Sequence, residues 1–123
     1  MIETFSKHYL LELWECENNL LDDIKYIERT MVEAALECGA EIREVVFHKF
    51  SPVGISGVVL ISESHLTIHI WPVEKYAAID VFTCGDKIDP MIACDFLKEK
   101  LNSKKNYIKK FNRGNDEILE ELT

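Results

Sequence analysis

Residues 56–71 read SGVVLISESHLTIHIW, and this β-rich stretch sets the architecture that we expect for the whole chain. In its second half, Leu66, Ile68 and Ile70 would point to one side of a strand, while the residues between them point to the other side. The stretch is long for one strand, because strands usually have about 5–6 residues. We therefore predict a break near residues 62–64.

Around this stretch the sequence predicts a mixture of strands and helices. Further strands are expected at residues 8–14, 41–50 and 76–84, with a short one at 106–111. A helix is predicted over 20–38, where apolar residues recur at steps of three and four. A second helix is predicted to begin at Asp89-Pro90, because aspartate is a good N-cap and proline suits the first helical position.

The order of these elements, β-α-β-β-β-α-β, indicates the fold class. Several of the links between strands are too short for the crossovers that parallel strands need, which favours an antiparallel sheet. We expect a single α+β domain, a two-layer α/β sandwich in which both helices pack on one face of the sheet. The other face would carry residues such as His69, and an exposed sheet face with apolar members suggests a dimer or a substrate site.

The composition excludes several classes of protein. The chain has 123 residues, which is enough for one domain, and 47% of them are hydrophobic. With 14 basic and 22 acidic residues its net charge is −8, so nucleic acid and anionic membranes are poor partners. No apolar run approaches the 18 or so residues of a membrane span, and the first ten residues lack an apolar signal core. We therefore expect a cytoplasmic protein.

The four cysteines give little sign of a metal or disulfide framework. They form no C-x-x-C pair, which argues against zinc ribbons and thioredoxin-like sites: Cys16, Cys38, Cys84 and Cys94. In a reducing cytoplasm disulfides are rare. Composition alone therefore predicts that each cysteine is a small buried hydrophobic residue.

The polar stretch at residues 62–69, SESHLTIH, has two interpretations when only residue types are considered. It could be a strand with a solvated polar face, or it could carry a site. His65 and His69 share a face, but their Cα atoms would lie about 13 Å apart, too far for one metal ion on a straight strand. There is no glycine-rich phosphate loop and no G-x-S-x-G motif. Residue types alone therefore predict an α/β domain with a histidine-bearing strand and no metal site.

A larger pattern goes further, because several segments occur together and in order. They are KH at 7–8, ELWEC at 12–16, FSPVGISG at 50–57, ISESHLTIH at 61–69, WP at 71–72 and DVFTCG at 80–85. Together they resemble the prokaryotic S-adenosylmethionine decarboxylase family, over most of the chain. Members of that family make a pyruvoyl cofactor from an internal serine and use no metal, and the resemblance implies that this serine is Ser64.

The resemblance implies a self-cleavage between Glu63 and Ser64. The Ser64 hydroxyl would attack the carbonyl carbon of Glu63 and turn the amide into an ester, and elimination would then break the ester. One product is residues 1–63, the β chain. The other is residues 64–123, the α chain, whose N-terminus is blocked by the pyruvoyl group.

The resemblance also implies roles for three more residues. Ser56 would hydrogen-bond the processing intermediate, and His69 would take the proton lost from the Cα atom of Ser64, a task that suits a neutral imidazole. In the mature reaction the substrate amine forms a Schiff base with the pyruvoyl ketone and CO2 leaves. Cys84 would then return a proton to the substrate. By this resemblance the product would be decarboxylated S-adenosylmethionine, the aminopropyl donor of spermidine synthesis.

Recognition of the substrate is where this chain departs from the family pattern. Phe50 matches an aromatic residue that helps to hold adenine, although it could also be a core residue at a strand end. The glutamate that usually follows Trp-Pro and binds the ribose is Val73 here, and Glu74 beside it is the candidate substitute. Each ribose hydroxyl left unpaired would cost about 1–3 kcal/mol. L-Arginine and L-ornithine, which some relatives decarboxylate and which have no ribose, therefore remain the alternative substrates.

A different class of function is also open. A small dimeric binding module or regulatory subunit could share this fold and acidic surface. The co-occurrence of Ser56, Ser64, His69 and Cys84 favours the enzyme, because a binding module has no use for all four. The resemblance further implies that the two fragments form one protomer, and that two protomers pair with active sites near their interface.

Overall fold

The computed structural model describes residues 6–114, in which six strands and three helices follow one another. Their bounds are β1 (Ser6–Trp14), α1 (Asn18–Leu21), α2 (Ile24–Glu37), β2 (Ile42–Lys49), β3 (Ile55–Ile61), β4 (Ser64–Trp71), β5 (Tyr76–Cys84), α3 (Pro90–Lys100) and β6 (Lys105–Arg113). All neighbouring strands pair antiparallel, in the order β2-β3-β4-β5-β1-β6. The first strand of the chain therefore lies between β5 and β6.

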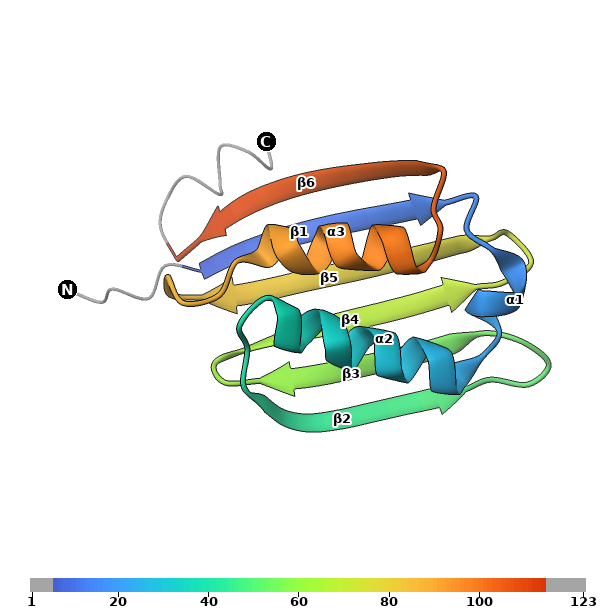
Figure 1. Cartoon of the computed structure of the whole chain (residues 1–123), viewed down its shortest axis with the longest axis horizontal. Coiled ribbons are helices and arrows are strands. Elements are labelled where there is room, and N and C mark those ends of the chain that lie inside the picture. The colour runs from blue at the N-terminus through green and yellow to red at the C-terminus, as the bar shows by residue number, and fades with distance from the viewer. Residues whose placement is uncertain (1–5, 115–123) are drawn as a thin grey trace.

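Two layers build the molecule, as predicted. Figure 1 shows α2 and α3 side by side on one face of the sheet, and no helix of the described chain lies on the other face. The interior between the layers is apolar and closed to solvent, with Leu11, Met31, Ile68 and Leu97 all fully buried. The predicted α+β class and two-layer sandwich are confirmed. The opposite sheet face, which we call the open face, is the one to which His69 belongs.

Strand β4 shows why the sequence folds in this way locally. Its residues alternate between buried and more exposed, from buried Ser64 to exposed Trp71, because successive side chains point to opposite sheet faces. The predicted break is a two-residue turn at Ser62-Glu63, after which Ser64 pairs with Ile61. The stretch at 56–71 is thus two paired strands, so the chain has one strand more than the predicted element order counted.

The helix predicted over 20–38 is wrong in one respect, because two helices occupy this range. The Asp23 side chain accepts a hydrogen bond from the backbone N–H of Tyr26 and so caps α2, which begins at Ile24. The apolar spacing continues across Asp23, so the sequence pattern gives no sign that one helix ends and another begins there. Leu36 belongs to that apolar pattern but is 57% exposed, because it falls on the outer side of α2, whereas Ala35 and Cys38 beside it are buried.

The second helix begins as predicted, with the Asp89 carboxylate accepting from the N–H of Met91 and Pro90 in the first turn. The last strand is longer than predicted, because β6 pairs with β1 along the whole length of both. Residues 115–123, where we expect a polar fraying end, lie outside the described part of the chain. No helix within residues 6–114 is long and apolar enough to cross a membrane.

Candidate active site

The turn between β3 and β4 holds the bond that the sequence pattern predicts to be cut. The Ser64 hydroxyl donates a hydrogen bond of 2.5 Å to the carbonyl oxygen of Glu63, the group that it would attack. Ser64 is only 6% exposed, because its side chain faces the helix layer. Glu63 has a φ of 65°, a left-handed conformation that non-glycine residues adopt at a cost of about 1 kcal/mol or more. The Ser64 hydroxyl, the predicted nucleophile, therefore lies beside a strained peptide.

Cys84 reaches the same carbonyl group from the end of β5. Its Sγ atom donates to the Glu63 oxygen at 3.2 Å, so that oxygen receives two donors. The Cys84 donor can polarise this carbonyl group and stabilise negative charge that develops on its oxygen, as an oxyanion hole does, while the Ser64 hydroxyl is the predicted nucleophile. Glu63 and Cys84 also line a cavity of about 420 Å³. We call Glu63, Ser64 and Cys84 the cleavage half-site.

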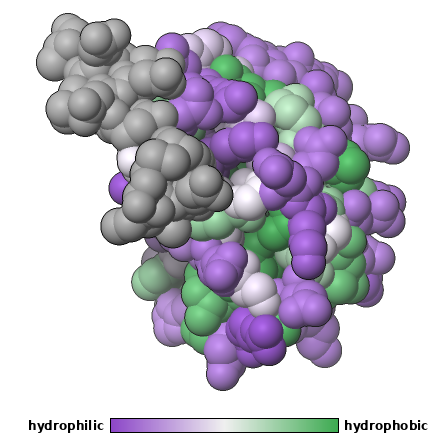
Figure 2. Space-filling view, turned by 90° about the vertical axis from the view of Figure 1, so that its left-hand side faces the viewer, coloured by the Kyte–Doolittle hydropathy of each residue, from purple (hydrophilic) through white to green (hydrophobic). Residues whose placement is uncertain are grey.

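The surface around the start of β4 is polar. Figure 2 looks at the molecule from the end where the turn between β3 and β4 lies, and shows a mostly hydrophilic surface with smaller hydrophobic patches between the charged side chains. The cleavage half-site therefore opens toward a solvated end of the molecule.

The other three cysteines are buried thiols, as composition alone predicts. Cys16, Cys38 and Cys94 are at most 3% exposed, whereas Cys84 is partly exposed. Burial raises the pKa of Cys16 to about 11 and that of Cys94 to about 12, and burial also raises the pKa of Cys38. These three thiols stay protonated and inaccessible at neutral pH. Cys84 is the cysteine that solvent and substrate can reach.

Ser56 and His69 form a second cluster on the open face. They are directly paired on β3 and β4, and the Ser56 Oγ and His69 Nδ1 atoms share a hydrogen bond of 2.8 Å. This bond fixes the orientation of the imidazole ring and leaves Nε2 outside the Ser56 contact. The structure therefore brings together the two residues that the family pattern pairs.

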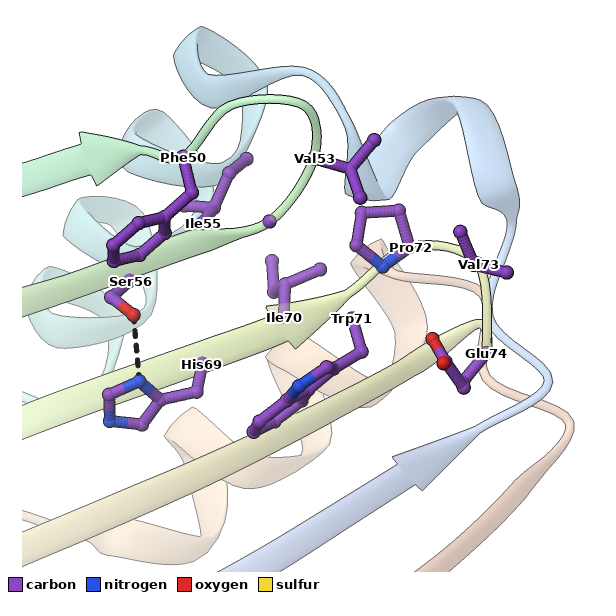
Figure 3. A pocket seen from close by; sticks show the side chains of 11 residues that line it. Phe50, Val53, Ile55, Ser56, His69, Ile70, Trp71, Pro72, Val73 and Glu74 are labelled. Atoms are coloured by element: carbon purple, nitrogen blue, oxygen red, sulfur yellow. Dashed lines mark hydrogen bonds between the residues drawn. The ribbon is translucent and has the colours of Figure 1, made fainter.

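A pocket lies beside this pair, with a volume of about 350 Å³. Its lining includes Phe50, Ser56, His69, Trp71, Val73 and Glu74. Figure 3 shows that Glu74 turns its carboxylate back toward Trp71, whereas the Val73 side chain lies along the outside of the turn after β4. We call this pocket, with Ser56 and His69, the pocket half-site.

Two exposed aromatic residues, Phe50 and Trp71, border the pocket. Phe50 is 47% exposed, which excludes the core interpretation that was open for it. Trp71 is 46% exposed and lies 6.3 Å from His69 between ring centroids, so a second aromatic face borders the pocket. The sequence pattern included Trp71-Pro72 but assigned no role to either residue.

The two half-sites do not meet within one chain. Ser64 begins β4 and His69 lies five residues later, which separates their Cα atoms by about 16 Å at 3.3 Å per residue. A proton transfer needs heavy atoms about 3 Å apart. His69 therefore cannot serve the Ser64 of its own chain, although sequence reasoning treats the four residues as one constellation.

A polar network on the open face was missed by the sequence analysis. Asp80 accepts hydrogen bonds from His8 Nε2 at 2.9 Å and from the Thr67 hydroxyl at 3.1 Å. Burial, and then the nearby His8, lower the pKa of His65. Alternating polar residues on three separate strands were the available signal, but the strand order was needed to bring them together. No cluster of three or more metal-ligating side chains lies within residues 6–114.

Comparisons with known proteins show the family to which the chain belongs. The model of a family described as S-adenosylmethionine decarboxylase matches residues 7–114. An S-adenosylmethionine decarboxylase proenzyme of Clostridium tetani is 55% identical over 113 residues, covering 92% of this chain and 90% of that protein. S-adenosylmethionine decarboxylase proenzyme 1 of Bacillus cereus is 56% identical over 103 residues, covering 84% and 79%.

Solved structures give the same result for the fold. The crystal structure of the adenosylmethionine decarboxylase from Aquifex aeolicus superposes with a TM-score of 0.85 at 29% identity, covering 94% of this chain and 95% of that one. A Trypanosoma brucei AdoMetDC monomer superposes with a TM-score of 0.63 at 14% identity, covering 83% of this chain and 44% of that one, and supports the fold alone.

Proposed function

Because the chain belongs to the S-adenosylmethionine decarboxylase family, it is a pyruvoyl-dependent decarboxylase of S-adenosylmethionine, and we propose that it makes its cofactor by cutting itself between Glu63 and Ser64. The product of catalysis is decarboxylated S-adenosylmethionine, the aminopropyl donor for spermidine. One observation supports the proposed cut most directly: the Glu63 carbonyl oxygen accepts hydrogen bonds from both the Ser64 hydroxyl and the Cys84 thiol. The names of the relatives do not favour L-arginine or L-ornithine as the substrate.

The proposed cut begins with a bond between Ser64 Oγ and the Glu63 carbonyl carbon. The peptide C–N bond breaks, the hydroxyl proton ends on the freed nitrogen, and an ester joins the two residues. Loss of the Ser64 Cα proton then expels the carboxylate of residues 1–63. Residue 64 is left as dehydroalanine. Water then replaces its nitrogen, which leaves as ammonia, and the pyruvoyl group remains. The Cys84 thiol stabilises the negative Glu63 oxygen in the first step.

In turnover, residue 64 would carry the pyruvoyl group, which would supply a ketone for the substrate amine and an acceptor for the electrons released as CO2 departs. We assign to Cys84 the return of a proton to the former α-carbon. Its position 3.2 Å from the Glu63 carbonyl oxygen, at the end of the bond that is cut, supports this role. Its exposure supports the role too, because the three other thiols are closed to substrate.

The pocket half-site is our candidate for the adenosyl group. Phe50 and Trp71 offer two exposed aromatic rings, which suit a flat adenine. Glu74 is the one carboxylate in the pocket lining, and it can accept hydrogen bonds from the ribose hydroxyls where Val73 cannot.

A complete site requires a second copy of the chain, and we propose a two-fold dimer. The open face exposes apolar side chains, among them Val46, Leu60 and Trp71. If two open faces pack with their β4 strands running in opposite directions, the cleavage half-site of one chain meets the pocket half-site of the other. His69 of the partner subunit then lies against the start of β4 from the open face, beside the backbone of Ser64, from whose Cα atom a proton has to be removed. The separation of about 16 Å along β4 supports this arrangement, because it prevents assembly in one chain.

We further propose that the two fragments stay together as one protomer, in the cytoplasm. After the cut, β1 of residues 1–63 would remain paired on both sides with strands of residues 64–123. All four cysteines are free, which fits a reducing compartment.

Intact-mass analysis of freshly purified protein tests the cut. We expect fragments of residues 1–63 and 64–123, the second with a blocked N-terminus, and we expect the Ser64→Ala variant to remain whole. A wild-type chain that stays whole after long incubation would refute the proposal. Release of CO2 from carboxyl-labelled S-adenosylmethionine, compared with L-arginine and L-ornithine, tests the substrate.

A further inference from the structure

Thr83, beside the cleavage half-site, has a feature that the proposed function does not explain. It is 1% exposed, and its Oγ1 atom is the buried side-chain polar atom that has no hydrogen-bond partner within residues 6–114. A buried hydroxyl without a partner destabilises a fold, and valine has the same shape without that cost. The position therefore keeps a polar atom that the uncut fold does not use.

The strand pairing places this hydroxyl next to the proposed nucleophile. The paired stretch of β4 and β5 ends at His65 and Phe82, and extending its register by one residue sets Thr83 opposite Ser64. The contact between Cys84 and Glu63 one step further on agrees with that register. Both side chains face the helix layer, since Ser64 is 6% and Thr83 1% exposed. Opposed residues in such a pair have Cβ atoms about 4.5–5.5 Å apart.

The chemistry of the first step requires an acceptor at this position. In the uncut chain the Ser64 hydroxyl donates its hydrogen to the Glu63 carbonyl oxygen. To attack the carbonyl carbon, the oxygen must turn a lone pair toward that carbon and direct its hydrogen elsewhere. Leu66 and Val81, the next residues on this face of β4 and β5, are apolar, and the ammonium of Lys7, which pairs with Thr83 from β1, can only donate. Thr83 Oγ1 can accept.

We propose that Thr83 is a positioning residue for self-cleavage, whose Oγ1 atom accepts the hydrogen bond of the Ser64 hydroxyl and so aims the nucleophile at Glu63. This inference rests on the proposed cut at Ser64. In the step itself the Oγ–C bond forms, the C–N bond breaks, and the hydroxyl proton finishes on the nitrogen of residue 64, while Thr83 is unchanged. Once the cut is made the Ser64 hydroxyl no longer exists, so Thr83 acts in processing and not in turnover.

The test compares the rates at which newly made chains are cut, measured by intact mass over time. We expect Thr83→Val to be cut at least about tenfold more slowly than wild type, and Thr83→Ser, which restores the hydroxyl, to be cut at close to the wild-type rate. Thr30→Val is the matched control, because Thr30 is 2% exposed on α2, outside both half-sites, and it should leave the rate unchanged. Turnover per pyruvoyl group, kcat and KM should be the same for Thr83→Val as for wild type.

A second measurement separates positioning from a merely structural role. In the uncut Ser64→Ala background, Thr83→Val should leave Tm equal or higher, because an unpaired buried hydroxyl is removed. A lower Tm would indicate that Thr83 supports the fold and would overturn the inference. Cutting of Thr83→Val at the wild-type rate would overturn it as well. A wild-type chain that stays whole would instead refute the proposed cut, and the inference with it.

Discussion

Co-expression of two inactive variants tests the division of the site between two chains. Five residues along β4 separate the Cα atoms of Ser64 and His69 in one chain by about 16 Å at 3.3 Å per residue, whereas proton transfer requires heavy atoms about 3 Å apart. Neither Ser64→Ala nor His69→Ala should be cut when made alone. Made together in equal amounts, they form two-fold dimers at random, and each mixed dimer contains one intact site, with Ser64 from one chain and His69 from the other.

The expected yield follows from this pairing. About half of the His69→Ala chains are in mixed dimers, so about half of them should be cut, as quantified by intact mass with differently tagged chains. The control is co-expression of wild type with a chain carrying both substitutions. There the mixed dimers have no intact site, and about half of the wild-type chains should stay whole. Complete cutting of the wild-type chains in this control, with no cutting in the first mixture, would show that His69 acts within its own chain and would refute the reasoning.

Three further predictions concern single residues. Cys84→Ala should still form some pyruvoyl group, but its turnover per pyruvoyl should fall by about 10²–10⁴-fold, because the proton donor is lost; near-normal turnover would mean that another group delivers the proton. Glu74→Gln should raise KM for S-adenosylmethionine by about tenfold for each 1.4 kcal/mol of ribose binding lost. Val73→Glu should leave activity equal or better. If KM is unchanged in Glu74→Gln, the ribose contact lies elsewhere. Folding lowers the pKa of His65 from 6.5, so the unfolded chain binds more protons than the folded chain near that pH. The free energy of unfolding should therefore fall as the pH drops below about 7. In the Ser64→Ala background His65→Gln should make that fall in Tm shallower, and an equal slope would contradict this account.

Much of the fold could be predicted because local patterns agree with tertiary structure. The alternation of Leu66, Ile68 and Ile70 fits a strand with one buried face, and Asp89-Pro90 fits a helix start. The break in the first helix was not predictable from apolar spacing, because that spacing continues through Asp23. Only the hydrogen bond from Tyr26 to its carboxylate reveals the cap.

The candidate site was predictable as a set of residues but not as an arrangement. The ordered motifs identify Ser56, Ser64, His69 and Cys84. Their division into two half-sites depends on strand length and direction, because five residues along β4 exceed any side chain's reach. The position of Thr83 likewise depends on a register between β4 and β5 that no local pattern specifies.

The position of β1 between β5 and β6 bears on the order in which the chain folds and is cut. An intact chain brings β1 to its neighbours as part of the same polymer, at the high effective concentration that a covalent tether provides. Two separate fragments would have to find each other, with β1 entering between strands that must first part. If the chain is cut as proposed, we therefore expect folding to come before the cut. Fragments that heat has separated would not regain this arrangement readily, so we expect heat inactivation of the cut protein to be irreversible.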